Sequence, residues 1–338
     1  MSLPTPPPLV PNPEPVLLGD HVREVAWSPD HRMVVAALGS GELALVDVSG
    51  PTLVRRWPAH AFGVLRVAWS AGGLASAGED GRVRWWNPTD GSLVREHQDK
   101  GWVQHLAWSP DGTLLAAAAG KVLRIAGADG SLILEYPHHA STISSMVWRN
   151  DGKGIATACF GRVQLLRLGE AKPYEDLRWK TAHVSLAWSP NGRHLAAGSQ
   201  ENTVTYWKLP FRGPEPLHMS GYPSKVKALA WDRESRLLAT GGGQAITVWD
   251  VSGAGPAGAR PLQLEGHLEK VACLAWQRQG EVLASGDAGG GVWLWTPARG
   301  SGGMPAATLK AEITALAWSR DEKLLVAATA EGHLQLMR

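Results

Sequence analysis

The sequence predicts an all-β fold: a closed β-propeller of eight four-stranded antiparallel blades, with a seven-bladed ring as the alternative. First, a motif close to Ala-Trp-Ser-Pro-Asp occurs eight times in the 338 residues. Second, its tryptophans lie 39 to 45 residues apart, which is about the length of one blade. Third, turn residues divide each interval into short apolar stretches. The eight anchor tryptophans are Trp27, Trp69, Trp108, Trp148, Trp188, Trp231, Trp276 and Trp318.

The second repeat shows the strand pattern most clearly. Glu79-Asp80-Gly81 has the composition of a tight hairpin turn, and glycine-containing turns also follow the first and third strands. Residues 82–87 alternate polar and apolar, as expected for a half-buried strand. The four expected strands are residues 64–69, 74–78, 82–87 and 92–97.

From about residue 16 to the C-terminus, the repeats resemble the WD40 family, whose pattern runs from Gly-His through a Ser-Pro-Asp-Gly turn to a final Trp-Asp. The resemblance implies a structural tetrad, a chain of hydrogen bonds inside the blade, and we expect the second repeat alone to carry all of it. His139 and His267 hold the tetrad histidine position in two other repeats, nine residues before Trp148 and Trp276. The tetrad of the second repeat is His60, Ser76, Asp80 and Trp86.

The chain ends predict how the ring closes. The last repeat has strand candidates at 324–328 and 333–337 after its anchor but no fourth one, so we expect residues 15–18 to complete it. Such closure removes open sheet edges. Residues 1–13 contain six prolines and are predicted to form a disordered lead, which leaves residues 14–338 as one domain. The Gly/Pro-rich segments 209–216, 251–261 and 297–305 are expected to be flexible connections.

Composition argues against several classes of protein. The chain has 33 basic and 31 acidic residues without a basic run, so we expect no nucleic-acid partner. The N-terminus has no secretory pattern, and no apolar run approaches the ~20 residues of a membrane span, so we expect a cytoplasmic protein. Cys159 and Cys273 lie in apolar strands and are expected to be buried thiols. We further expect a monomer without a cofactor.

Motifs for catalysis are absent. The sequence contains no Gly-x-Ser-x-Gly, His-Glu-x-x-His, Cys-x-x-Cys or phosphate-loop pattern, so an enzyme is the least favoured class. The twelve histidines show no paired ligand spacing. One position, three residues before each anchor, is polar in the first five repeats and predicts either a hydrated channel or a small-ligand or metal site. Its residues are Glu24, Arg66, His105, Ser145, Ser185, Ala228, Cys273 and Ala315.

Aromatic and basic residues indicate a protein-binding patch. They gather around the loops that the resemblance places on the top face, and aromatic and arginine anchors carry much of the energy of interfaces. We therefore interpret the chain as a non-catalytic scaffold that binds a partner peptide or domain there. The alternative is an accessory protein that binds a metal or small ligand in a metal-insertion or metal-chaperone system. The candidate partner-binding residues are Phe62, Arg66, Trp102, Phe160, Trp179, Lys180, Tyr222, Lys225 and Lys227.

Overall fold

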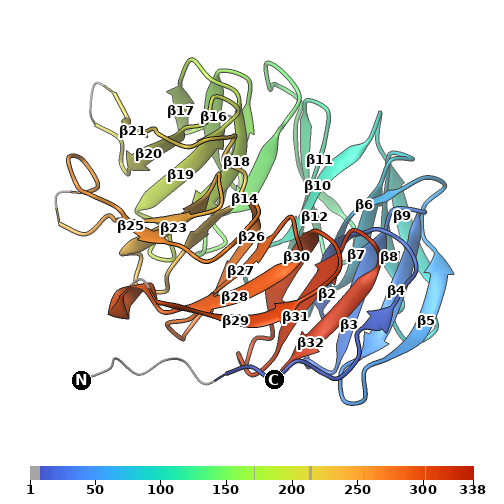
Figure 1. Cartoon of the computed structure of the whole chain (residues 1–338). Coiled ribbons are helices and arrows are strands. Elements are labelled where there is room, and N and C mark those ends of the chain that lie inside the picture. Colours follow the sequence, from blue (N-terminus) through green and yellow to red (C-terminus); the bar gives the residue numbers. More distant parts are fainter. Residues whose placement is uncertain (1–7, 171, 213–214, 254, 301) are drawn as a thin grey trace. The chain divides into compact units, whose positions relative to one another are not determined.

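The computed structural model describes residues 8–170, 172–212, 215–253, 255–300 and 302–338. Its strands form eight separate four-stranded antiparallel sheets (Figure 1), and one short 3-10 helix, η1 (Pro297–Arg299), interrupts them. The fold is an eight-bladed β-propeller, which confirms eight blades rather than seven. The chain divides into two compact units, residues 16–183 and residues 1–15 with 184–338, called here the first and second unit.

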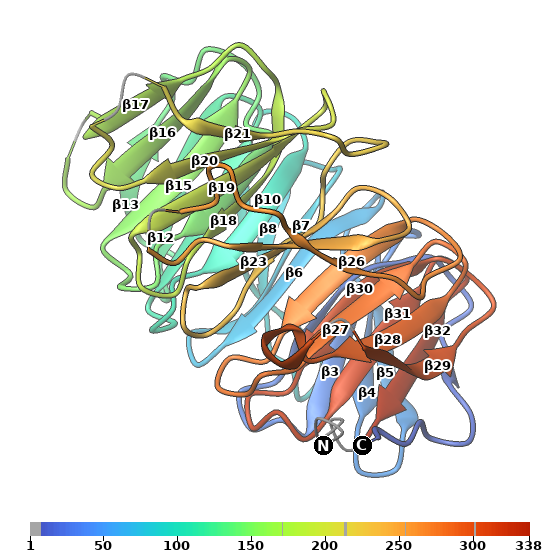
Figure 2. The same ribbon diagram turned by 60° about the vertical axis from the view of Figure 1, so that its left-hand side comes forward.

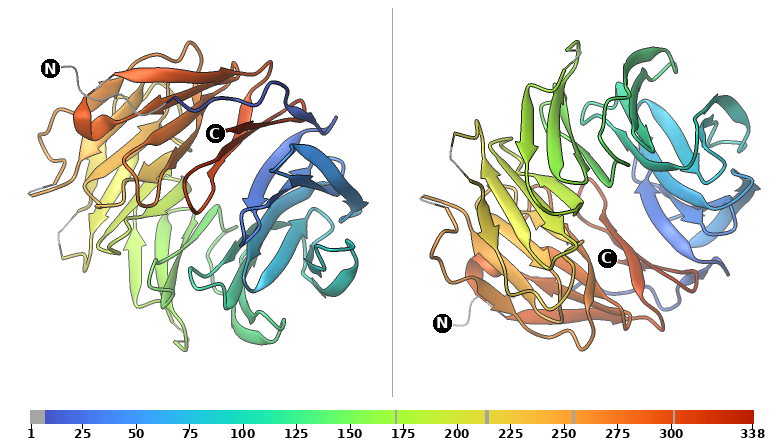
Figure 3. Two further views of the ribbon diagram at one scale, coloured as in Figure 1. Left: turned by 90° about the horizontal axis from the view of Figure 1, so that it is seen from below. Right: turned by 90° about the horizontal axis from the view of Figure 1, so that it is seen from above.

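Blades 1 to 4 and the short strand β1 (Val16–Leu17) make up the first unit, and these blades follow one another in chain order (Figure 3). Blade 1 is β2 (Val22–Trp27), β3 (Met33–Leu38), β4 (Glu42–Asp47) and β5 (Thr52–Pro58). Blade 2 is β6 (Val64–Ser70), β7 (Gly73–Gly78), β8 (Arg82–Trp86) and β9 (Leu93–Gln98). Blade 3 is β10 (Val103–Trp108), β11 (Leu114–Ala119), β12 (Val122–Gly127) and β13 (Leu132–Tyr136). Blade 4 is β14 (Ser145–Trp148), β15 (Gly154–Cys159), β16 (Arg162–Arg167) and β17 (Glu175–Arg178).

Blades 5 to 8 have the same meander order, and Figure 2 shows the strands of blade 7 side by side. Blade 5 is β18 (His183–Trp188), β19 (His194–Ser199), β20 (Val204–Lys208) and β21 (Leu217–Met219). Blade 6 is β22 (Leu229–Trp231), β23 (Leu237–Gly241), β24 (Ile246–Asp250) and β25 (Leu262–Leu264). Blade 7 is β26 (Val271–Trp276), β27 (Leu283–Asp287), β28 (Gly291–Trp295) and β29 (Gly303–Thr308). Blade 8 is β30 (Ile313–Trp318), β31 (Leu325–Thr329), β32 (His333–Met337) and β1 (Val16–Leu17).

The predicted N-terminal strand is confirmed, because β1 takes the fourth place in blade 8. The pairing also extends upstream, since Val10 and Arg338 exchange backbone hydrogen bonds of 2.6 and 2.9 Å and Asn12 N–H donates to Leu336 O at 2.9 Å. Pro11 fits between them because proline is tolerated on an edge strand. Of the predicted lead, residues 1–7 lie outside the described part of the chain, whereas residues 10–12 are paired.

The three Gly/Pro-rich segments, predicted to be flexible connections, each include positions outside the described residues. The third also contains regular structure, because η1 lies within it and β29 begins at Gly303. The proline at 297 starts η1, consistent with its preference for the first helical turn.

The anchor tryptophans join neighbouring blades. The indole N–H of Trp148 donates to Ala107 O at 2.9 Å, and that alanine directly precedes the anchor of the previous blade. Trp108 makes the same bond to Ala68 O, Trp231 to Ala187 O, and Trp318 to Ala275 O, at 3.3, 3.0 and 3.0 Å. Apolar cores also fill the space between neighbouring blades, as where Val35 and Leu43 of blade 1 cluster with residues of blade 2. The repeated Ala-Trp pair is therefore a blade-to-blade contact.

Blade 2 contains the expected tetrad as a chain of hydrogen bonds. Trp86 Nε1–H donates to Ser76 Oγ at 2.8 Å, Ser76 Oγ lies 2.7 Å from His60 Nε2, and His60 Nδ1 lies 2.8 Å from Asp80 Oδ1. The pKa of His60 is lowered by burial, although Asp80 opposes this shift, so the ring is neutral near pH 7.

The expectation that blade 2 alone carries a full tetrad is wrong, because blade 7 has a second one. Trp295, Ser285, His267 and Asp287 form the same chain at 2.7, 2.6 and 2.6 Å. Here the aspartate follows the serine by two residues, whereas Asp80 follows Ser76 by four, so the pattern of blade 2 does not detect it. The pairing of Asp287 with His267 is decided by the fold of the turn after β27.

Blade 3 has lost its tetrad and contains a cavity in its place. Asp99 and Ala117 stand where blade 2 has His60 and Ser76, and Asp99 pairs instead with Arg124. Ala126 pairs with Leu115 where blade 2 has Trp86 against Leu74. A cavity of about 50 Å³ is lined by all of these blade 3 side chains and by Trp85, whose buried indole N–H has no hydrogen-bond partner among the described atoms. A larger side chain occupies the position of Ala126 in blades 1, 4, 6, 7 and 8. These residues are Val46, Leu166, Trp249, Trp295 and Met337.

We expect Ala126→Val to stabilise the protein by about 1 kcal/mol, because two buried methyl groups would occupy the cavity. The reverse change, Val46→Ala at the same place in blade 1, should lower the free energy of unfolding by about 1–3 kcal/mol, since Val46 is fully buried. Urea unfolding curves measure both. A destabilised Ala126→Val variant would show that the cavity cannot accept a larger side chain.

We expect the protein to lose stability in acid through His139. Its Nε2 lies 2.8 Å from Thr157 Oγ1, and burial lowers its pKa from 6.5 to about 4. Because the folded pKa lies below the unfolded one, the contribution is present above pH 6.5 and is lost as the pH falls toward 4. Urea unfolding at pH 7 and pH 4 gives the decrease in the free energy of unfolding between the two values. For His139→Gln this decrease should be about 2 kcal/mol smaller than for the wild type. His218→Gln, at an exposed position, should behave as the wild type, and equal losses in all three proteins would contradict the assignment.

Candidate interaction surface

In the first unit, two kinds of loop meet at one end of each sheet. The loop that leaves a blade lies on the turn between the second and third strands of that blade, as where Asp99 N–H donates to Gly81 O at 2.7 Å and Trp179 N–H to Gly161 O at 3.0 Å. Position 41 requires glycine for two reasons. Its φ of 98° is one that other residues rarely adopt, and a Cβ there would lie 2.1 Å from Phe62 O. We call this end of the sheets the loop end.

Three large aromatic side chains stand out from the loop end of the first unit. Phe62 precedes β6, Trp102 precedes β10, and Phe160 occupies the turn between β15 and β16. They are 63%, 55% and 66% exposed. Hydrogen bonds hold these loops: His60 N–H donates to Gly41 O at 2.8 Å, Asp99 N–H to Gly81 O at 2.7 Å, and Phe160 N–H to Ser141 Oγ at 2.8 Å. Such exposure of large apolar side chains on neighbouring loops is typical of a binding surface.

The other predicted residues of the first unit differ in accessibility. Trp179 is half-buried before β18, and Lys180 beside it is exposed. Arg66 lies inside β6 and is half-buried, with Nη1 donating to its neighbour Leu65 O at 2.9 Å. Arg66 is therefore part of an inner strand and not of a loop.

In the second unit, Tyr222 is buried and forms part of the interior of blade 6. It stands nine residues before Trp231, where other blades have the tetrad histidine. Trp249 Nε1–H donates to its hydroxyl at 2.8 Å, and the hydroxyl lies 2.8 Å from Thr240 Oγ1. Lys225 and Lys227 are exposed on the segment that follows.

Sequence reasoning missed Leu268, which is 83% exposed in the loop before β26 of the second unit. It directly follows the tetrad histidine His267, and the tetrad spacing alone places it on that loop. The search for large aromatic residues did not include it.

The position three residues before each anchor also connects blades. His105 Nε2 lies 3.1 Å from Ile143 O of the next blade, and Glu24 Oε2 accepts from Val67 N–H at 2.7 Å. Ser185 Oγ and Cys273 Sγ donate to Val226 O and Ile313 O at 3.1 and 3.3 Å. Four of the side chains at this position therefore bind backbone groups in, or shortly before, the first strand of the next blade.

Burial changes the protonation of these inner residues. It lowers the pKa of His105 to about 4, with the charge of Arg66 acting in the same direction. It raises the pKa of Cys273 to about 12 and raises that of Glu24, although Arg66 and the Val67 N–H oppose the shift of Glu24. The imidazole and the thiol are thus uncharged near pH 7, as suits groups that bind backbone carbonyls.

A second exposed apolar set lies on the outer strands of blades 1 to 3. In each blade a β-bulge skips one β-branched residue, namely Val54, Val94 and Ile133. Each bulged residue and the leucine before it are 41% to 57% exposed. Bulges interrupt the ladder of an edge strand and oppose pairing with another chain. These residues offer a comparison set for the aromatic loops.

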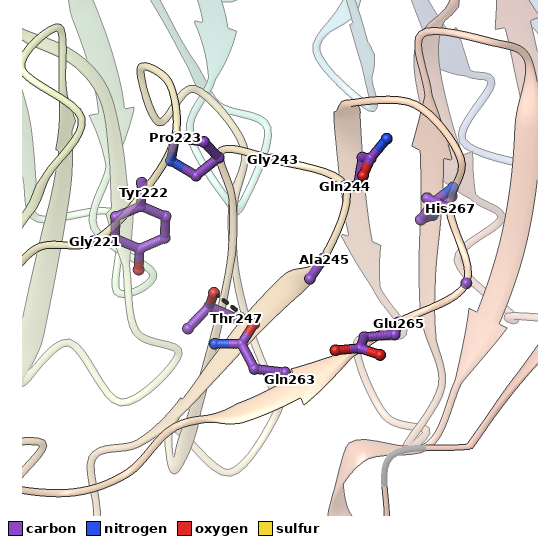
Figure 4. Close-up of a pocket in the computed structure, with 11 residues that line it drawn as sticks. Gly221, Tyr222, Pro223, Gly243, Gln244, Ala245, Thr247, Gln263, Glu265 and His267 are labelled. Atoms are coloured by element: carbon purple, nitrogen blue, oxygen red, sulfur yellow. Dashed lines mark hydrogen bonds between the residues drawn. The ribbon is translucent and has the colours of Figure 1, made fainter.

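A pocket of about 420 Å³ opens in the second unit where the loops before β22 and before β26 meet the turn between β23 and β24 (Figure 4). Figure 4 shows Tyr222 and Pro223 on one side, Gln244 and His267 on the other, and the amide of Gln263 directed at Thr247. Gly243 permits the close contact of two loops, since a Cβ there would lie 2.6 Å from Pro223 Cγ. The remaining lining residues are Gly221, Gly243, Ala245, Thr247 and Gly266.

Metal ligands do not gather in the described part of the chain, where no group of three His, Cys, Asp or Glu side chains is placed to hold an ion. Cys159 is a buried free thiol, and Cys273 is a half-buried one. Among the residues that the structure describes, no helix has the length and apolar character to cross a membrane.

Comparison with known proteins connects the repeats to a family. The family model described as "WD domain, G-beta repeat" matches residues 51–87, 91–134, 176–208, 215–250 and 259–296. These segments begin at the outer strand of blade 1 and end in blade 7, and they omit the first three strands of blades 1 and 4 and all of blade 8.

Several curated relatives share part of the chain. WD repeat-containing protein slp1 of Schizosaccharomyces pombe is 23% identical over 245 residues, which cover 70% of this chain and 42% of slp1. THO complex subunit 3 of Arabidopsis thaliana is 35% identical over 72 residues, 20% of this chain and 23% of that protein. Probable cytosolic iron-sulfur protein assembly protein 1 of Candida glabrata is 31% identical over 91 residues, 24% and 27% of the two chains. The chain thus spans less than half the length of each of these relatives.

The fold also has a close structural counterpart. The computationally designed Ika8 protein superposes with a TM-score of 0.81 at 19% identity, and the match covers 96% of this chain and 98% of Ika8. At this identity the likeness concerns the fold alone. WD40 propellers generally act as protein-interaction scaffolds and are typically not enzymes. With family matches over more than half of its length, set on the repeated four-stranded blades, this chain belongs to the WD40-repeat family.

Proposed function

We propose that the protein is a non-catalytic interaction scaffold that binds a partner peptide or domain on the loop end of its first unit. The observation that carries this proposal is the exposure of Phe62, Trp102 and Phe160, each more than half accessible on loops held by backbone hydrogen bonds. Aromatic side chains of this size supply a large contact area at little cost in conformational entropy. A rigid frame lowers that cost further.

The charge beside the aromatics indicates the kind of partner. Lys180 is exposed next to Trp179 at the same loop end, so a partner with acidic residues around an apolar or aromatic centre would match it. Lys225 and Lys227 belong to the second unit, where they stay candidates for a separate contact. Tyr222 is buried and Arg66 is part of an inner strand, so neither is included in the proposed surface.

The alternative function, an accessory role in metal insertion, has less support. The printed name of the Candida glabrata relative concerns iron-sulfur protein assembly, and only 24% of this chain matches it. No specific feature of the described residues favours this alternative over the scaffold. The cytoplasmic location and the monomeric state stay predictions.

We expect the triple variant Phe62→Ala, Trp102→Ala, Phe160→Ala to lose its partner. Truncation of an anchor side chain costs about 1–2 kcal/mol of binding free energy. The loss of three such side chains should therefore lower recovery of the partner in affinity capture from native lysate by about tenfold or more. The variant should keep the wild-type melting curve because these side chains project from the fold.

The matched control removes exposed apolar side chains elsewhere on the same unit. Leu53→Ala, Val94→Ala, Leu132→Ala changes three side chains that are 41% to 57% exposed on outer strands, and it should capture the partner as the wild type does. Equal recovery by the aromatic variant and the wild type would refute the loop-end surface. Equal loss in both triple variants would place the contact outside that surface.

A further inference from the structure

We propose that the pocket of the second unit lined by Tyr222, Gln244 and Glu265 binds the guanidinium group of an arginine side chain in a partner polypeptide. The pocket belongs wholly to the second unit, so this inference is independent of the loop-end surface of the first unit. Its volume of about 420 Å³ lies within the range of protein ligand sites. Its lining includes the polar side chains of Gln244, Thr247, Gln263 and Glu265, which favours a polar guest.

The charge of the pocket favours a cation. Glu265 is exposed and is the only acidic residue among the described lining residues, which include no lysine or arginine. His267 adds no positive charge, because its two ring nitrogens contact Asp287 and Ser285 and burial lowers its pKa. The carboxylate of Asp287 behind this ring adds negative potential. A guest with a positive group therefore complements the site.

Most other polar groups of the pocket already have partners within the protein. Thr247 Oγ1 donates to Gln263 Oε1 at 3.2 Å, and Gln244 Nε2 donates to Leu268 O at 2.5 Å. Two bonds hold the hydroxyl of Tyr222. These contacts fix the walls in place before a ligand arrives, which reduces the entropy lost on binding. The carboxylate of Glu265 is left as the acceptor for the guest.

The shape of the walls favours arginine over lysine. The ring of Tyr222 and the ring of Pro223 form one side of the pocket, and Glu265 approaches from below (Figure 4). A guanidinium is planar, so it can lie against an aromatic ring and donate two parallel hydrogen bonds to a carboxylate. A lysine ammonium is a point charge without a planar fork, so it can neither stack on the ring nor pair with both carboxylate oxygens in this fixed geometry.

The test uses the full-length protein and a pair of short peptides. Acetyl-Gly-Gly-Arg-Gly-Gly-amide is compared with the same peptide carrying citrulline, which keeps the shape and removes the charge. Saturation-transfer NMR and titration should show the arginine peptide binding about fivefold or more tightly than the citrulline peptide. Equal binding of the two peptides to the wild type would overturn the proposal.

Two variants place the binding in this pocket. Glu265→Gln should reduce the affinity for the arginine peptide to that for the citrulline peptide, whereas Glu269→Gln, an exposed carboxylate in the same loop outside the lining, should leave it unchanged. Ala245→Phe should block the pocket by volume at an unchanged melting temperature. Equal losses in both glutamate variants, or wild-type binding by Ala245→Phe, would contradict the assignment.

The triple variant of the aromatic loops should bind the arginine peptide normally, so failure of either proposal is distinguishable from failure of the other.

Discussion

The hydrogen bond from an anchor indole to a backbone carbonyl of the previous blade, made by Trp108, Trp148, Trp231 and Trp318, is the contact on which this architecture depends. It needs a large side chain with a single N–H, and it needs a small residue in front of the preceding anchor so that the ring reaches the carbonyl. Trp148 against Ala107 and Trp231 against Ala187 both meet these conditions. At Ala107-Trp108 both residues of the motif are used, since Trp108 donates to blade 2 and Ala107 accepts from Trp148 of blade 4.

With adjacent blades joined in this way, the hydrogen bonds inside a blade become dispensable. Blades 2 and 7 keep full tetrads, and blade 6 replaces the histidine with Tyr222. Blade 3 has none and keeps its four strands, because the apolar core against blade 2 still holds them. The cost of the loss is local: a small cavity at Ala126 and an unpaired indole N–H on Trp85. Stability here is set mainly by contacts between sheets.

The same frame determines where binding can occur. Loops that rest on the turns of their own blades have little freedom, so side chains at their tips keep their positions without a ligand. Phe62 and Trp102 of the first unit gain their exposure in this way, and the walls around Glu265 of the second unit are held by Thr247 and Gln263. The two proposed sites differ in chemistry, one aromatic and one acidic, so they would recognise different features of a partner.

Local sequence patterns were enough to predict the number of blades, the strands of the second repeat, the closing N-terminal strand and the exposed Phe62, Trp102 and Phe160. This is possible because strand alternation, turn residues and the anchor interval are local patterns that repeat eight times. Tertiary structure decided which polar residues are buried. Tyr222 and Asp287 join interior hydrogen-bond chains only because neighbouring strands place Trp249 and His267 against them. The pocket around Glu265 likewise depends on how three separate segments, residues 221–223, 243–245 and 265–267, meet in the fold, and no local pattern specifies this.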